Sequence, residues 1–363
     1  MINSPFLSAS LVSREAELQQ IRQILLKDGD FLLVGVPGSG RRTLLREAAR
    51  AANARILEID CLRSTSASQF LRRLANSITD CFTDPEAIAL LQKWGIDQPF
   101  TVELSPAGQA RLVWHTPASK EWPLFEGLLS LPQFMSEHLD CRVVMVFQNF
   151  PHIRSWDRQG KWETYLRQEI QRHSRVSYAL VATVAEPWVY ASNLEVVHLL
   201  PLSNEAMARW LVETMKGENL QFSGEDGAIA LFLSYVQGHL GNAIVLARRI
   251  WLDHNAYNYA DRTIYAHHVH RSMLTLVEDL SVNFESLVML LPPSQVRVLE
   301  SLALDPTDSP QAREYIKKHQ LSRGGGLQGA LNSLEQKGLI YGPKYGYRIA
   351  LPFLEFWLKQ RLA

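Results

Sequence analysis

Three glycines, Gly35, Gly38 and Gly40, lie in the segment "FLLVGVPGSGRRTLL", between a short apolar run and a stretch with helical spacing. A glycine turn that leads from a buried strand into a helix directs successive backbone N–H groups at one anion. The six-residue frame from Gly35 to Gly40 is typical of loops that bind the phosphates of a nucleotide. The chemistry indicated is therefore nucleotide binding, and a glycine turn without a ligand is the alternative.

The two residues after this loop depart from the usual pattern. A phosphate-binding loop normally continues with a lysine, which reaches the terminal phosphates, and a serine or threonine, whose hydroxyl binds magnesium. Arg41 and Arg42 occupy those places here, and Thr43 follows one residue too late. Arginine keeps the positive charge but replaces a compact ammonium with a wide planar fork. Magnesium binding at this loop is therefore doubtful.

A second departure follows the apolar run "RVVMVF" at 142–147, which predicts a buried strand. Phosphoryl transfer needs carboxylates at the end of such a strand, to hold the metal and to activate water. Gln148 and Asn149 stand there instead, and amides can neither act as a base nor neutralise Mg²⁺. The sequence therefore predicts a site without catalytic residues and without metal ligands.

The elements around these residues predict a parallel α/β domain over residues 1–201. Strands are expected at "FLLVG", "RILEID", "RVVMVF", "SYALVAT" and "LEVVHLL", with helices between them. This alternation is typical of a doubly wound parallel sheet. An insertion at about 83–120 contains "FTVELSPAGQARLVWH", whose alternation on both sides of "SPAG" predicts a hairpin.

Two further domains are predicted after residue 201. Residues 202–285 have almost entirely helical spacing, which predicts a helical domain. Residues 286–363 contain three short helical segments followed by "LIYGPKYGYRIAL", a predicted strand pair around a glycine turn. Three helices and a hairpin make a winged helix-turn-helix domain.

The composition excludes several classes of protein. Lys and Arg together number 37, as do Asp and Glu, so the chain is not a globally basic nucleic-acid binder. The apolar runs are too short to span a membrane and the first residues lack the pattern of an export signal, which makes a cytoplasmic location the expectation. Cys61, Cys81 and Cys141 have no metal-ligand spacing and are expected to be buried thiols in a reducing compartment.

Taken in order, "LVSREAELQQIRQIL", "FLLVGVPGSGRRTLL", "RVVMVFQNF" and "RHSRVSYALVATVAEP", followed by the predicted winged helix, resemble P-loop ATPases of the AAA+ superfamily. The resemblance is to the origin-recognition, STAND and archaeal-type ATPase branch, and it covers nearly the whole chain. It implies a P-loop sheet domain, a helical lid and ATP or ADP bound between them.

The resemblance also implies which residues make the site. Gln148 and Asn149 match the Walker B acids, Thr183 matches the polar sensor on the next strand, and the segment 185–200 lacks the arginine finger that relatives often carry. The residues that match the nucleotide-binding segments are Leu11, Val12, Arg14, Gly35, Val36, Pro37, Gly38, Ser39, Gly40, Arg41, Arg42 and Thr43.

The winged helix has few residues suited to nucleic acid. Polar and basic side chains of its predicted recognition helix and wing could meet bases and phosphates, but a firm phosphate footprint usually has more basic residues. Winged helices of this family also dock proteins, so DNA and a protein both remain open as partners. The expected DNA contacts are Arg323, Gln328, Asn332, Lys344 and Arg348.

These observations predict a catalytically degenerate AAA+ or STAND-like protein. It would bind ATP or ADP without hydrolysis, or no nucleotide, and act as a regulatory or adaptor subunit, with an active ATPase relative as one candidate partner. One alternative is an active ATP-dependent switch in which Thr43 reaches the metal and Glu186 supplies the carboxylate. Another is a DNA-binding regulator that uses the ATPase body as a scaffold.

Overall fold

The structure is a computed structural model, which describes residues 13–97, 99–106, 108–114, 121–170, 172, 174–256 and 262–363. The chain forms two compact units. The α/β unit comprises Glu15–Val34 and Arg41–His198, and the C-terminal unit comprises Leu199–Ala363 with the loop Gly35–Gly40 and Arg14. Leu11 and Val12 lie outside the described residues.

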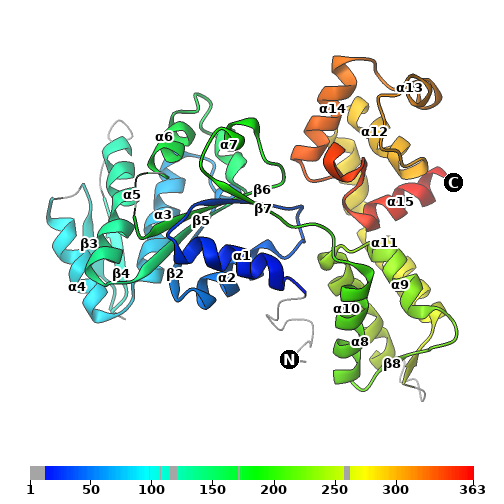
Figure 1. The fold of residues 1–363 in the computed structure, drawn as a ribbon, viewed down its shortest axis with the longest axis horizontal. Helices are drawn as coiled ribbons and strands as arrows, with labels where there is room; N and C mark the ends of the chain where they lie inside the picture. Colours follow the sequence, from blue (N-terminus) through cyan, green and yellow to red (C-terminus); the bar gives the residue numbers. More distant parts are fainter. Residues whose placement is uncertain are drawn as a thin grey trace. The chain divides into compact units, whose positions relative to one another are not determined.

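A five-stranded parallel sheet forms the centre of the α/β unit (Figure 1). Its order is β2-β5-β6-β1-β7, and the pairings between neighbours are all parallel. Every residue of β6 is buried, as expected for a strand covered by helices on both faces. The predicted doubly wound sheet is thereby confirmed. The strands are β1 (Phe31–Val34), β2 (Ala54–Asp60), β5 (Arg142–Gln148), β6 (Val176–Ala182) and β7 (Glu195–His198).

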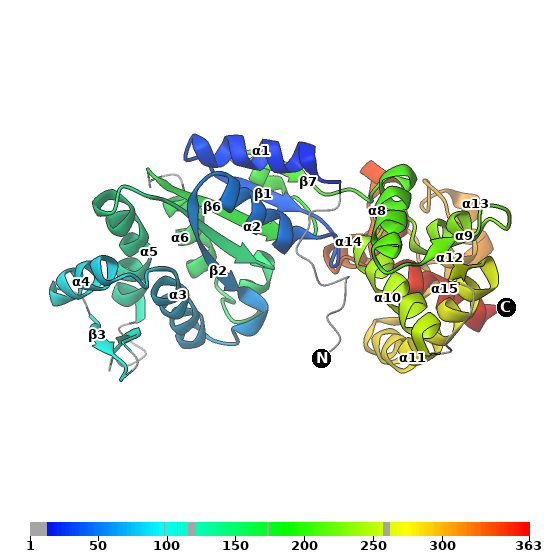
Figure 2. The same ribbon diagram turned by 90° about the horizontal axis from the view of Figure 1, so that it is seen from below.

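Helices cover the two faces of this sheet. Helices α1 (Glu15–Leu26) and α2 (Arg41–Ala51) lie on one side, and α3 (Ala67–Cys81) and α5 (Glu121–His138) lie on the other (Figure 2). Helix α3 begins at its N-cap Ser66, whose hydroxyl accepts a hydrogen bond from the N–H of Gln69. Short helices follow three of the strands at the carboxyl edge, where they position polar residues. They are η2 (Cys61–Arg63), η5 (Phe150–Ser155) with α6 (Lys161–Glu169), and α7 (Pro187–Tyr190).

The insertion between β2 and β5 contains a helix and a hairpin. Helix α4 (Pro85–Trp94) starts at the N-cap Asp84 and continues into η3 (Gly95–Asp97). Strands β3 (Thr101–Leu104) and β4 (Ala110–Val113) pair antiparallel. The hairpin predicted around "SPAG" is therefore confirmed.

The lid of the C-terminal unit is helical, as predicted, with one addition. Its helices are α8 (Asn204–Gly217), α9 (Ala228–Val236), α10 (Leu240–Ala256) and α11 (Ala266–Leu290). The addition, which was not predicted, is a parallel pair of two-residue strands, β8 (Gln221–Phe222) and β9 (Thr263–Ile264). Strands this short carry too few residues to show an alternating pattern.

The winged helix follows in the same unit and shares one apolar core with the lid. Its helices are α12 (Pro293–Leu304), α13 (Arg313–His319) and α14 (Gly325–Gln336), and its wing consists of the antiparallel strands β10 (Ile340–Tyr341) and β11 (Arg348–Ile349) around η6 (Pro343–Tyr345). Helix α15 (Pro352–Leu362) ends the chain and buries Phe353, Leu354 and Trp357. Within the described part of the chain, no helix is both long and apolar enough to cross a bilayer.

Candidate functional site

The glycine loop has the backbone that its sequence predicts. Gly38 and Gly40 have φ angles of +83° and +90°, a region that side chains with a Cβ rarely adopt. The N–H of Ser39 donates to the carbonyl of Val36 at 3.2 Å, which closes a turn between β1 and α2. The loop therefore has the strand-turn-helix context that phosphate binding requires.

Residues of the lid hold this loop from within the C-terminal unit. The imidazole of His239 donates from Nε2 to the carbonyl of Pro37 at 2.9 Å, while its Nδ1 accepts the N–H of Asn242 at 3.0 Å. The N–H of Gly241 donates to the carbonyl of Gly38 at 2.9 Å. These partners require a neutral ring, and burial accordingly lowers the pKa of His239. The sequence analysis did not predict a role for His239, because no local pattern shows that this side chain meets a loop about 200 residues earlier in the chain.

Two more predicted site residues belong to the C-terminal unit. Ser39 is buried in the loop, and among the described residues its hydroxyl has no hydrogen-bond partner. A buried hydroxyl without a partner is costly unless a ligand or water satisfies it. Arg14 is also buried, and it donates from Nη2 to the carbonyl of Leu200. This bond ties the N-terminal segment to the chain that leads into the lid.

In the α/β unit, Arg41 of the loop motif lies close to Asn149, one of the two amides that follow β5. Arg41 donates from Nη2 to Oδ1 of Asn149 at 3.5 Å, the limit of hydrogen-bond distance. Asn149 has a left-handed backbone and donates from Nδ2 to Oδ1 of Asp60 at 3.1 Å. Burial lowers the pKa of Arg41, and the charge of Asp60 opposes this effect. The guanidinium, the amide and the carboxylate thus form a chain across neighbouring strands.

Arg42 and Gln148 meet at a different carboxylate. The Nε of Arg42 lies 2.5 Å from Oε1 of Glu58, and Nε2 of Gln148 donates to the same oxygen at 3.2 Å. Glu58 also forms an ion pair with Arg46, whose Nη2 lies 2.8 Å from Oε2 of Glu58. The side chain that takes the place of the magnesium-binding hydroxyl therefore points to strand β2.

Glu58 and Asp60 are the acids that sequence reasoning missed. They lie on β2, which pairs with β5 in parallel register so that Asp60 is opposite Gln148. The signal was available, because "RILEID" ends in alternating carboxylates and carboxyl ends of neighbouring parallel strands lie at one edge of a sheet. The two threonines named from the sequence are both half-buried. Thr43 lies in the first turn of α2, and Thr183 lies directly after β6.

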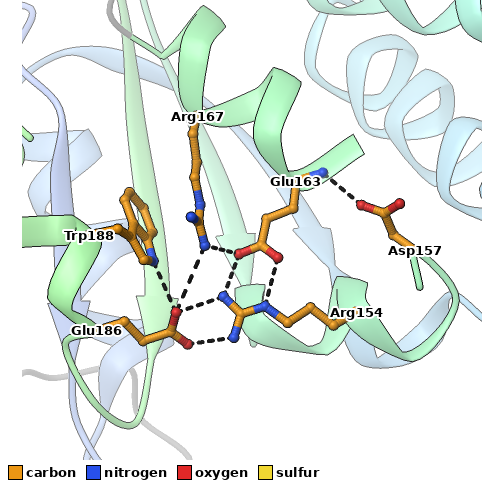
Figure 3. Close-up of polar contacts among 6 residues, drawn as sticks. All are labelled: Arg154, Asp157, Glu163, Arg167, Glu186 and Trp188. Atoms are coloured by element: carbon orange, nitrogen blue, oxygen red, sulfur yellow. Dashed lines mark hydrogen bonds and ion pairs between the residues drawn. The ribbon is translucent and has the colours of Figure 1, made fainter. Parts of the chain in front are cut away.

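Glu186, the alternative source of a carboxylate, is held in a network of charges (Figure 3). Arg154 donates to both of its oxygens, at 2.7 and 2.6 Å, and the indole of Trp188 donates to Oε2 at 3.0 Å. Burial acts to raise the pKa of Glu186, but hydrogen bonds and charge from Arg154 hold it below its ordinary value. A carboxylate with both oxygens engaged and a lowered pKa is a poor general base.

Arg154 also binds a second carboxylate, that of Glu163. Arg154 donates from Nε to Oε2 of Glu163 at 2.6 Å. Arg167, which lies on α6 with Glu163, donates to its Oε1. The backbone N–H of Glu163 donates to Asp157 at 2.9 Å (Figure 3). Arg167 in turn stacks over the ring of Trp188 at 3.8 Å. The network joins η5, α6 and α7, and its role in the described structure is to fix these short helices.

The three cysteines are free, but only Cys61 is buried. Cys81 and Cys141 are half-buried, which corrects the expectation that all three are buried thiols. Their raised pKa values, with desolvation as the largest cause, mark all three as protonated at neutral pH, and that of Cys81 is about 12.

The predicted contacts of the winged helix are all exposed, on α14, just before it and in the wing. On α14 the amide of Gln328 donates to Asn332 at 2.6 Å. In the wing the guanidinium of Arg348 lies 5.1 Å from the centroid of Tyr341, and the ammonium of Lys344 lies 5.5 Å from that of Tyr345. The wing is therefore a small surface of basic and aromatic side chains.

Comparisons with known proteins give two domain matches. A model of the AAA domain, dynein-related subfamily, matches residues 30–90, and a model described as a probable winged helix domain matches residues 282–360. A search of curated proteins found no match.

Solved structures match nearly the whole chain. A Walker-type ATPase of Pyrococcus abyssi has a TM-score of 0.66 and 15% identity, and the match covers 96% of each chain. The ORC2 protein of Aeropyrum pernix, in ADPNP-ADP complexes, has a TM-score of 0.53 and 12% identity over 99% of this chain and 98% of its own. The ORC1 protein of Aeropyrum pernix, in complex with DNA, has a TM-score of 0.50 and 15% identity over 99% of this chain and 97% of its own. The chain therefore has the fold of the AAA+ ATPases, with an AAA domain and a C-terminal winged-helix domain.

Proposed function

We propose that this protein binds an adenine nucleotide without hydrolysing it and works as a regulatory or adaptor subunit in the cytoplasm. The observation that carries the proposal is the pairing of the substituted residues with each other and with β2. Arg41 contacts Asn149, and Arg42 and Gln148 share Glu58. Groups that would bind magnesium in an active ATPase are thus replaced by a cation and amides that have other partners.

The residues present fit a phosphate group better than a metal ion. The loop offers a glycine backbone at φ +83° and +90° and the buried hydroxyl of Ser39, which has no hydrogen-bond partner in the described part of the chain. Both are suited to phosphate oxygens. Magnesium would need a hydroxyl at Arg42 and a carboxylate at Gln148 or Asn149, and none of these is in the chain. A bound nucleotide would supply its phosphate charge, which the guanidinium of Arg41 would balance.

Nucleotide binding that does not depend on magnesium is the expected result. Isothermal titration with ADP and ATP should give dissociation constants that change less than about twofold when magnesium is replaced by EDTA, since arginine and amides stand where the metal ligands would be. Arg41→Ala is expected to weaken binding about tenfold, because it removes a partly buried cation. Arg50→Ala, at the other end of the same helix, where Arg50 pairs with Glu47, is the matched control.

Two results would contradict this proposal. One is phosphate release from ATP that requires magnesium and is abolished by Gln148→Ala, which would establish the active switch. The other is the absence of nucleotide binding, which would leave a scaffold. A gain of function gives an independent check, because combining Arg41→Lys, Arg42→Thr, Gln148→Asp and Asn149→Glu should make binding depend on magnesium.

The winged helix is proposed as the docking module, with DNA or a protein as its partner. The DNA option is supported by the exposed basic wing and by the fold shared with the DNA-bound ORC1 protein. Binding of a mixed-sequence duplex should weaken steeply between about 50 and 200 mM salt, and Lys344→Glu should weaken it several-fold. Lys216→Glu, an exposed lysine on α8, makes the same charge change outside the wing. Duplex binding that is insensitive to salt, or equally affected by both variants, would point to a protein partner.

A further inference from the structure

Strand β2 has a free edge. It is the last strand of the sheet and pairs with β5 alone among the described strands. About half of the backbone N–H and C=O groups of an edge strand point away from its partner. Another extended segment can therefore add to such an edge.

A groove follows this edge of the sheet. Its volume is about 440 Å³. Helix α2 contributes Arg42 and Arg46 to one wall, α3 contributes Arg73 and Asn76 to another, and Glu58 comes from the strand itself. Lining residues from both neighbouring helices and from the strand place the groove along the edge and not on one face.

Arginines are the most numerous charged residues of the groove. Its charged lining residues are four arginines, Arg42, Arg46, Arg63 and Arg73, and three acids, Glu58, Asp60 and Asp80, whereas the whole chain has a net charge of zero. An excess of arginine in the lining favours an acidic ligand. Arginine is also the residue whose planar fork binds a carboxylate with two hydrogen bonds.

The arginines reach beyond the acids that they already contact. The side chains of Arg42, Arg46 and Arg63 are 61%, 52% and 68% exposed. The side chain of Glu58, which Arg42 and Arg46 share, is only 13% exposed. One carboxylate therefore neutralises a single charge of the pair, and the guanidinium groups remain open to solvent.

We propose that this groove binds an extended, acidic segment of a partner protein, which adds to β2 as a further strand. Its backbone would pair with the free edge, and its carboxylates would meet the arginines of α2 and α3. A polypeptide is favoured over nucleic acid because only a polypeptide can continue the ladder of main-chain hydrogen bonds. The proposal names a partner chemistry for the adaptor role proposed above, on which it rests, but it does not depend on nucleotide binding.

The test uses the full chain and a labelled peptide of about nine residues with alternating glutamate and valine, since extended residues advance about 3.3 Å each. Fluorescence anisotropy should show binding at least tenfold tighter than that of the matching lysine-valine peptide. The same glutamate peptide with N-methyl groups at alternate residues should lose this binding, because it cannot pair with a strand. Hydrogen exchange of the amides of 54–60 should slow when the glutamate peptide is added.

Variants localise the effect. Arg46→Glu and Arg73→Glu are each expected to weaken peptide binding about tenfold. Arg50→Glu, on the same helix as Arg46 but outside the groove, should not weaken it. The proposal is overturned if the lysine peptide binds equally well, if the N-methylated peptide is unaffected, if 54–60 gain no protection, or if a single-stranded oligonucleotide of equal charge protects 54–60 as well as the peptide does. Measurement with and without ADP separates this outcome from a failure of nucleotide binding.

Discussion

Replacing Arg154 by methionine is expected to lower the stability of the α/β unit by about 3 kcal/mol. The side chain of Glu163 is only 6% exposed and loses one of its two arginine partners, and Glu186 loses its bidentate partner. Burying a carboxylate without its cation is costly, whereas methionine keeps most of the aliphatic volume. Because the side chain of Arg154 is 40% exposed, the expected loss of stability is at the low end of that seen when one partner of a buried ion pair is removed.

The measurement is the midpoint of urea unfolding, together with hydrogen exchange of α6 and α7, which should become faster. Arg158→Met changes an exposed arginine in the turn that follows and serves as the control. An equal effect of both substitutions would mean that the network contributes no more than a surface charge. Arg154→Met combined with Glu186→Gln should cost less than the sum of the two, since they remove one interaction.

Asp30→Asn is expected to stabilise the protein at pH 8 but not at pH 4. Asp30 precedes β1 and accepts the N–H of Tyr178 at 2.7 Å. Burial, partly offset by this hydrogen bond, raises its pKa to about 7. The folded state therefore holds a proton that the unfolded state releases near pH 4, and the stability present below pH 4 is lost as the pH rises towards 7.

Asparagine keeps the acceptor for Tyr178 and removes the titration. The gain at pH 8 should be about 2 to 3 kcal/mol, less than the ~4 kcal/mol of the full pKa shift because Asp30 is only partly buried. Urea midpoints of both proteins between pH 4 and 8 give the difference. Asp28→Asn makes the same chemical change in the same turn, at a carboxylate paired with Arg142, and serves as the control. A difference for Asp30→Asn that stays constant with pH would show that folding does not shift the pKa of Asp30.

The sequence alone determined the order of elements and the substituted positions of the site. Local patterns were sufficient because buried parallel strands are continuous apolar runs and glycine turns need residues without a Cβ. "RVVMVF" therefore predicted β5, and Gly38 and Gly40 predicted the loop. The sequence alone was sufficient to recognise the substitutions at Arg41, Arg42, Gln148 and Asn149.

Only the tertiary structure decided the partners of these residues. Glu58 and Asp60 are about 90 residues from Gln148 and Asn149 in the chain, and parallel pairing of β2 with β5 brings them together. His239 is 202 residues from Pro37, and lid packing places it on the loop. The sequence left Glu186 open as a candidate base. In the fold, Arg154 donates hydrogen bonds to both of its carboxylate oxygens. Periodicity reports burial within one element, but hydrogen bonds between elements depend on sheet order and register, which no local pattern encodes.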